Sequence, residues 1–128
     1  MSIDIRNDVV GLAQLLADHQ GGETLVMDLR KLSSWTDFFV LTSATSTTHM
    51  RGLVRHAEEY LAPRGLSPLK RPQLAEDEEW CLMDCGDFVV HIMSPGARAF
   101  YELDKLWFEA EITAIEPVSA GPGGKPGE

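Results

Sequence analysis

The chain has 128 residues, of which 44% are hydrophobic, and this length and composition fit one globular domain that can bury its own core. It carries 20 acidic and 11 basic side chains, which give a formal net charge of -9 at pH 7. This negative charge argues against direct binding to nucleic-acid phosphates, whereas it suits a basic protein partner.

The first third of the chain predicts a helix followed by two interior strands. The helix ends before Gly21 and has apolar residues at helical spacing, namely Ile5, Val9, Leu12 and Leu16. Residues 24–28 and 37–42 are short apolar runs bounded by polar residues, as expected for strands inside a sheet. Residues 29–36 are predicted to form the loop between the two strands.

A second helix is predicted after Ser46, whose side chain can cap it by accepting a backbone N–H bond. Its apolar positions keep helical spacing at Met50, Leu53, Val54, Ala57, Tyr60 and Leu61. Pro63 and Gly65 end this helix. Residues 66–70 are then predicted to add a short strand, and the acidic run 76–79 to form a solvated connection.

Residues 80–84 and 88–93 predict a β-hairpin around a tight turn at Cys85-Gly86. Both strands are apolar at almost every position, so both faces of the hairpin need cover. A partner molecule is one candidate for that cover. The hairpin therefore directs attention to binding before catalysis.

The end of the chain predicts one more helix, from Ala97 to Ala110, and then a tail. The helix has a broad apolar stripe made of Phe100, Leu103, Leu106, Trp107 and Ala110. Residues 117–128 are rich in glycine and proline without apolar periodicity, which predicts disorder and leaves a domain of residues 1–116. The predicted fold is a compact α/β sandwich with a mixed sheet of about five strands and three main helices.

The two cysteines, Cys81 and Cys85, are predicted to be reduced. Four residues apart in one strand, they would lie about 13 Å from each other, which is too far for a disulfide. No histidine or further cysteine stands at ligand spacing beside them, so no metal is expected. Reduced thiols and the lack of a signal-peptide pattern predict a cytosolic protein, and the apolar runs are too short to span a bilayer.

An enzymatic alternative rests on carboxylates at predicted strand ends. Asp28, Asp37 and Asp84 could bind magnesium in a nucleotide-binding or residual nucleotidyltransferase-like protein. That chemistry also needs a phosphate-binding element, yet the sequence has neither a P-loop nor a Gly-x-Gly-x-x-Gly turn. Aspartates at strand ends and turns also commonly bond local backbone amides. No catalytic residue or cofactor is predicted, and the nucleotide-binding alternative stays open.

The aromatic residues give a stronger indication of function. Trp80, Tyr101 and Trp107, with Arg98 and Lys105 near them in sequence, are residue types that dominate protein interfaces, although both tryptophans could equally be core. Three helices cannot easily cover both faces of a sheet of about five strands. An apolar sheet face that stays open usually marks a binding site for a partner.

From about Ile5 to Trp107 the chain resembles the ribosomal silencing factor family, also called RsfS or Iojap. The residues that carry the resemblance are 33–40, Thr45-Ser46, His49, Trp80, Asp84, Gly86-Asp87, 89–93, Arg98 and 101–107. Two positions depart from the family pattern. Gln73-Leu74 stands where Glu-Gly is usual, and Ala44 stands where a glycine is usual.

The resemblance implies a non-enzymatic translational repressor with a nucleotidyltransferase-like fold that lacks the catalytic machinery. Such a factor docks on the fourteenth ribosomal protein of the large subunit and blocks association with the small subunit, in starvation or stationary phase. Members are often homodimers when free. The implied protein needs no cofactor and no metal.

A docking surface follows as a hypothesis. Its predicted members are Trp80 and Leu82 on one hairpin strand, His91 and Met93 on the other, and Tyr101 and Lys105 on the last helix. A predicted acidic rim beside them consists of Asp77, Glu78 and Glu79. This rim would attract a basic ribosomal protein. Strand phase alone leaves open which face of the hairpin is exposed.

Overall fold

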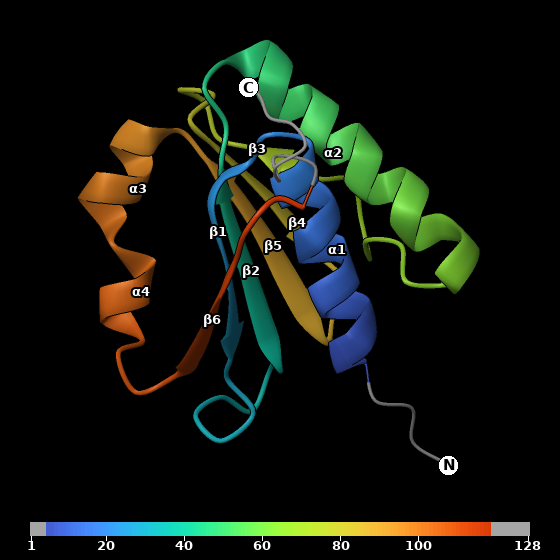
Figure 1. Ribbon diagram of the computed structural model, residues 1–128, viewed down its shortest axis with the longest axis vertical. Coiled ribbons are helices and arrows are strands. Elements are labelled where there is room, and N and C mark those ends of the chain that lie inside the picture. The colour runs from blue at the N-terminus through green and yellow to red at the C-terminus, as the bar shows by residue number, and fades with distance from the viewer. Residues whose placement is uncertain (1–4, 119–128) are drawn as a thin grey trace.

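The computed structural model describes residues 5–118, and these form a six-stranded mixed sheet with helices on both faces (Figure 1). The elements in chain order are α1 (Arg6–Asp18), β1 (Gly22–Asp28), β2 (Phe38–Ser43), α2 (Thr47–Leu61), the 3-10 helix η1 (Ala62–Arg64), β3 (Gln73–Leu74), β4 (Trp80–Asp84), β5 (Phe88–Met93), α3 (Pro95–Tyr101), α4 (Leu103–Leu106) and β6 (Glu111–Ile115). The predicted α/β class and mixed sheet are confirmed.

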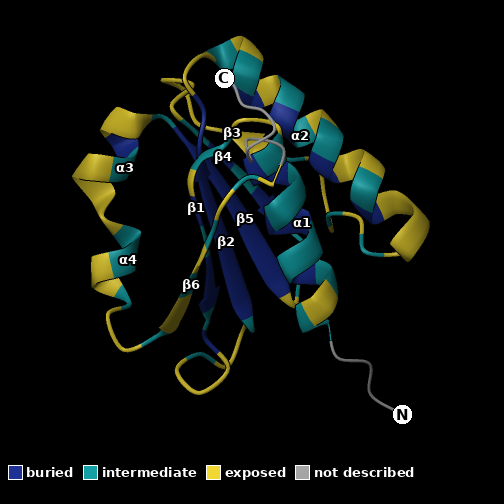
Figure 2. Ribbon diagram, in the orientation of Figure 1, coloured by how far each residue is buried: buried dark blue, intermediate teal, exposed yellow. Residues whose placement is uncertain are grey.

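The strand order is β3-β4-β5-β2-β1-β6. Strands β2 and β5 pair in parallel and all other neighbours are antiparallel. Parallel strands need a crossover connection, and the chain from β2 to β5 runs through α2. Every residue of β2 and β5 is buried, as expected for central strands covered on both faces (Figure 2).

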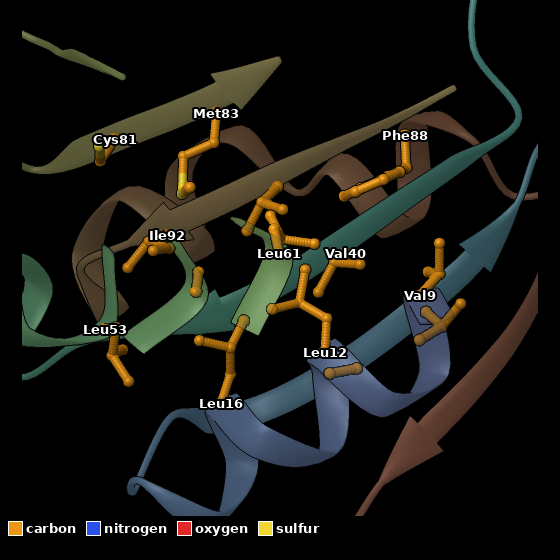
Figure 3. Packing of buried hydrophobic residues seen from close by; sticks show 14 of the residues in the cluster. Val9, Leu12, Leu16, Val40, Leu53, Leu61, Cys81, Met83, Phe88 and Ile92 are labelled. Carbon is orange, nitrogen blue, oxygen red and sulfur yellow. The ribbon is translucent and has the colours of Figure 1, made fainter. Parts of the chain in front are cut away.

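The main core lies between the sheet and helices α1 and α2 (Figure 3). Leu12 and Leu16 of α1 pack with Leu53 and Leu61 of α2 against alternate strand residues such as Ile92. Ser46 caps α2 as predicted, because its side chain accepts a hydrogen bond from the His49 amide at 3.0 Å. None of the helices within residues 5–118 is long and apolar enough to cross a membrane.

A smaller apolar cluster lies on the opposite face of the sheet. Its buried members come from β1, β2 and β5 and from the residue after β1, and they are Met27, Leu29, Phe39, Leu41 and Val89. Leu103 and Trp107 pack over it from the C-terminal segment. Helices α3 and α4 stand on this side, away from α1 and α2 (Figure 1).

The strand predicted at residues 66–70 is wrong. Pro68 lies in the middle of that run and has no amide hydrogen for a sheet ladder, and the segment has no regular structure, with a bend at Leu69 and Lys70. The added strand is β3, which has two residues and pairs with β4 through Gln73↔Leu82 and Leu74↔Cys81. One of the two departures from the family pattern, Gln73-Leu74, therefore forms this edge strand.

The single C-terminal helix predicted from Ala97 to Ala110 is also wrong in its extent. It breaks at Glu102, which has φ 46° and ψ 54° and separates α3 from α4. The chain then turns at residues 107–110 and forms β6, which pairs with β1 at the sheet edge and raises the strand number from about five to six. Because the helix is broken, its predicted apolar stripe divides, and Phe100 and Leu106 stay 77% and 69% exposed.

The predicted disordered tail, residues 117–128, lies outside the described residues except for Pro117 and Val118. The Val118 amide donates a hydrogen bond to Asp18 Oδ1 at 2.7 Å. Gln14 of α1 donates to the Glu116 carbonyl at 2.7 Å. These two bonds attach the residues that follow β6 to α1.

Candidate docking surface

The four predicted hairpin residues share one face of the sheet. Trp80 is paired with Met93 across the β4–β5 ladder, and Leu82 is paired with His91. The residues that alternate with them, Cys81, Met83, Val90 and Ile92, belong to the core under α1 and α2. The hairpin face that carries Trp80 is therefore the one turned away from these two helices.

The four residues differ in how much of each is exposed. Trp80 and Leu82 are half-buried, whereas His91 is 4% exposed and Met93 is fully buried. His91 and Met93 thus support the surface from beneath in this structure, and β4 and its edge neighbour β3 provide the accessible part. The alternation of side chains along each strand predicted that the four residues share a face, but it could not predict which of them are buried.

Tyr101 of α3 joins this face through ring contacts. Its ring centroid lies 4.8 Å from that of Trp80 and 4.9 Å from that of Phe100. Tyr101 is 50% exposed and Phe100 is 77% exposed. Trp80 and Leu82 also line a hollow of about 270 Å³ together with Gln73, Leu74 and Ala75. We call Leu74, Trp80, Leu82, Phe100 and Tyr101 the Trp80 surface.

Sequence reasoning missed two members of the Trp80 surface, Phe100 and Leu74. Phe100 was assigned to the apolar stripe of a long helix, and only the break at Glu102 shows that it faces solvent. Leu74 lies between the strand predicted at residues 66–70 and the predicted acidic connection at 76–79, and its pairing with Cys81 brings it to the edge of the sheet.

His91 holds the Trp80 indole in place. The indole Nε1–H donates a hydrogen bond to His91 Nδ1 at 3.1 Å. An indole N–H can only donate, so Nδ1 is the acceptor and the neutral ring carries its proton on Nε2. Within residues 5–118 that buried Nε2 has no hydrogen-bond partner, and the ring lies 4.4 Å from that of Phe39. Burial lowers the pKa of His91 to about 4, so the ring is neutral at pH 7.

Lys105 lies in a different place from the other predicted residues. Its side chain is 74% exposed on α4 and forms an ion pair with Glu102 at 2.9 Å, a contact that raises its pKa. It lines a separate cleft of about 870 Å³, whose walls include Gly22, Glu23 and Arg98. The predicted set therefore divides between the Trp80 surface and this cleft.

The predicted acidic rim lies on the turn between β3 and β4, next to Trp80, and its three residues are exposed. Two of the carboxylates also have local structural roles. Asp77 Oδ1 accepts a hydrogen bond from the Glu79 amide at 3.0 Å, and Glu79 Oε1 accepts one from the Ser94 hydroxyl at 2.7 Å. Glu78 occupies the turn with φ 56°.

Two of the three carboxylates of the nucleotide-binding alternative, those of Asp28 and Asp84, accept hydrogen bonds from nearby residues. Asp28 forms an ion pair with Arg30 at 2.7 Å, and the hydrogen bond from Arg30 is the main reason that its pKa is lowered. Asp84 Oδ1 accepts a hydrogen bond from the Gly86 amide at 2.9 Å. Asp37 contributes a backbone contact instead, since its main-chain amide donates to the Asp87 carbonyl at 2.9 Å. Among the described residues, no group of three His, Cys, Asp or Glu side chains could hold a metal ion.

Both cysteines are free thiols, as predicted. Cys81 is buried and Cys85 is half-buried, and burial raises their pKa values to about 11 and about 12. They are therefore protonated at neutral pH and have the character of small core side chains rather than nucleophiles.

Comparison with known proteins gives one consistent family. The sequence model of the family described as "Ribosomal silencing factor during starvation" matches residues 2–125. The ribosomal silencing factor RsfS of Treponema pallidum is 35% identical over 97 residues, which cover 75% of this chain and 86% of that protein. The chloroplastic protein Iojap of Zea mays is 32% identical over 110 residues, which cover 84% of this chain and 45% of that protein. A crystal structure of a Chromobacterium violaceum protein has a TM-score of 0.74 at 26% identity, covering 95% of this chain and all of that one.

Proposed function

The chain belongs to the ribosomal silencing factor family, and from this premise we propose that it represses translation by binding the large ribosomal subunit through the Trp80 surface. The contact is made with the fourteenth ribosomal protein of that subunit, and the bound factor prevents the small subunit from joining. The protein acts in the cytoplasm during starvation or stationary phase. Free protein is a homodimer, and the ribosomal protein competes for a protomer surface.

The observation that carries this proposal is the exposed aromatic group on one side of the sheet. Phe100 is mostly exposed and Tyr101 is half exposed. Their rings contact each other, and Tyr101 also contacts the half-buried Trp80. Exposed apolar patches usually mark partner sites, and tryptophan and tyrosine are the residues most often found at the energetic centre of an interface. The hollow beside Trp80 and Leu82 can accept an apolar side chain from the partner.

The mechanism requires no chemical step. A factor that occupies the joining face of one subunit lowers the concentration of subunits able to associate, in proportion to its occupancy. Residues of the Trp80 surface then act by contact area and shape. The proposal assigns no catalytic residue to the chain.

The proposal is tested by co-sedimentation with separated large and small subunits and by a subunit-joining assay. We expect retention on the large subunit only, with joining reduced as occupancy rises. Phe100→Ala should weaken retention about tenfold, because this ring is on the Trp80 surface. Phe108→Ala is the matched control, since Phe108 is 76% exposed but lines another hollow, with Leu32 and Leu106. Absence of retention on either subunit would reject the proposed function.

The acidic rim predicts electrostatic steering toward a basic partner. Raising the salt concentration from about 50 to about 300 mM should slow association more than it speeds release. The double variant Asp77→Asn/Glu78→Gln should bind about fivefold more slowly at low salt, because two charges beside Trp80 are lost. Glu79 is left intact because it bonds Ser94.

Stopped-flow association kinetics measure this effect. Glu109→Gln removes one exposed carboxylate next to Phe108 and serves as the control. An association rate that does not change with salt, or that falls equally in the control, would remove the steering role of the rim.

A further inference from the structure

Helix α3 carries two members of the Trp80 surface but has little packing of its own. It has seven residues, and Ala97 is its one buried side chain (Figure 2). Isolated helices of this length are not stable in water, so contacts outside the helix must fix its position. The residue that follows it, Glu102, has a left-handed conformation, and α4 adds only four residues beyond it.

The first anchor of α3 is at its N-terminus. Ser94 accepts a hydrogen bond from the Ala97 amide at 3.0 Å, and its own hydroxyl donates to Glu79 at 2.7 Å. The Ser94 amide also donates to the Glu79 carbonyl at 2.8 Å. These bonds fix where the helix starts, whereas its direction depends on contacts made further along the helix.

The second anchor is Arg98, in the middle of the helix. Its Nη2 donates to the Glu23 carbonyl at 2.7 Å, and its Nη1 donates to Ser43 Oγ at 3.0 Å and to the Gly22 carbonyl at 3.4 Å. All three acceptors are uncharged and belong to the start of β1 and the end of β2. The guanidinium thus links α3 to two strands more than fifty residues away in sequence.

The carbonyls are available because the β1–β2 ladder is irregular there. The register shifts between Gly22 and Leu25, and Glu23 has φ 42°. An irregularity of this kind leaves backbone groups without a partner in the neighbouring strand. Only an arginine has a planar fork that can reach several such oxygens at once, because the ammonium group of lysine is a single point charge.

Tyr101 follows Arg98 by three residues and is therefore its neighbour on the helix surface. We propose that Arg98 is a positioning residue for the Trp80 surface: by binding Gly22, Glu23 and Ser43 it holds α3 so that Tyr101 stays against Trp80. The partner then meets an aromatic surface that is already in its bound arrangement, which saves the cost of ordering it. This inference rests on the proposed function for its binding consequence, whereas its structural part concerns the free protein.

The structural part is tested by nuclear magnetic resonance on the free protein. In the wild type, the aromatic protons of Trp80 and Tyr101 should show nuclear Overhauser contacts, since the ring centroids lie 4.8 Å apart. Arg98→Lys keeps the charge but loses the fork, and these contacts should weaken or vanish. Ser43→Ala removes one acceptor of the Arg98 guanidinium and should weaken the contacts between Trp80 and Tyr101 to a smaller extent. This variant replaces Arg98→Lys in the test if Arg98→Lys does not fold. Arg55→Lys, on the exposed face of α2, is the control.

The binding part is tested by a double-mutant cycle on large-subunit affinity. Arg98→Lys should lower the affinity about tenfold in the wild type and less than about twofold in the Tyr101→Ala background. An equal loss in both backgrounds would show that Arg98 touches the partner directly and would overturn the positioning role. Unchanged ring contacts in Arg98→Lys would overturn it too. If the wild type itself fails to bind, the proposed function fails, and the ring contacts still decide the role of Arg98 in the free protein.

Discussion

Replacing Trp80 by alanine is expected to weaken binding to the large ribosomal subunit by about 30- to 1000-fold, or about 2–4 kcal/mol. The indole contacts Tyr101 on one side and His91 on the other, and it forms a wall of the hollow next to Leu82. Truncation removes the largest side chain of the Trp80 surface. It also leaves His91 Nδ1 without its donor.

The measurement is a titration of labelled protein with purified large subunits, together with urea unfolding to confirm that each variant is folded. Trp80→Phe separates two causes, because it keeps an aromatic ring but loses the N–H group that bonds His91. Trp35→Ala is the matched control, since it deletes an even more exposed indole, 59% accessible, from the loop before β2. If Trp80→Ala binds within about threefold of the wild type, the Trp80 surface is not where the partner docks.

The location of this surface was largely predictable from strand periodicity. Side chains alternate between faces of a strand, so Trp80 and Leu82 had to share a face, as did His91 and Met93. Ladder register then brought the two pairs together. Periodicity could not say how deep each residue lies, because the rings that pack on His91 come from residues elsewhere in the sequence, Phe39 and Trp80.

The C-terminal part was the least predictable, and for a physical reason. Glu102 adopts a left-handed conformation that sequence normally signals by glycine or asparagine, so nothing local marks the end of α3. Strand β6 is fixed by pairing with β1, more than eighty residues earlier in the sequence, rather than by its own weak pattern. Lys105 was placed with Tyr101 on one continuous helix face, and the break at Glu102 separates them.

Acidification is expected to destabilise the protein through His91. Burial depresses the pKa of this residue from 6.5 to about 4 in the folded state. As the pH falls below 6.5 the unfolded chain takes up the proton first, so stability is full above that pH and declines down to about pH 4. The depression corresponds to a loss of about 3 kcal/mol in the free energy of unfolding across this window. Below pH 4 both states are protonated, and His91 contributes no further change.

Urea unfolding at several pH values between 7 and 4 measures this loss. His91→Asn offers an oxygen acceptor to the Trp80 indole in place of Nδ1 but cannot take up a proton, so its unfolding free energy should fall about 3 kcal/mol less over the same range. An identical pH dependence in His91→Asn and the wild type would mean that His91 is not the group that titrates. A protonated Nδ1 could no longer accept the indole N–H hydrogen bond that orients Trp80. If His91 does not titrate in this range, this hydrogen bond does not depend on pH there.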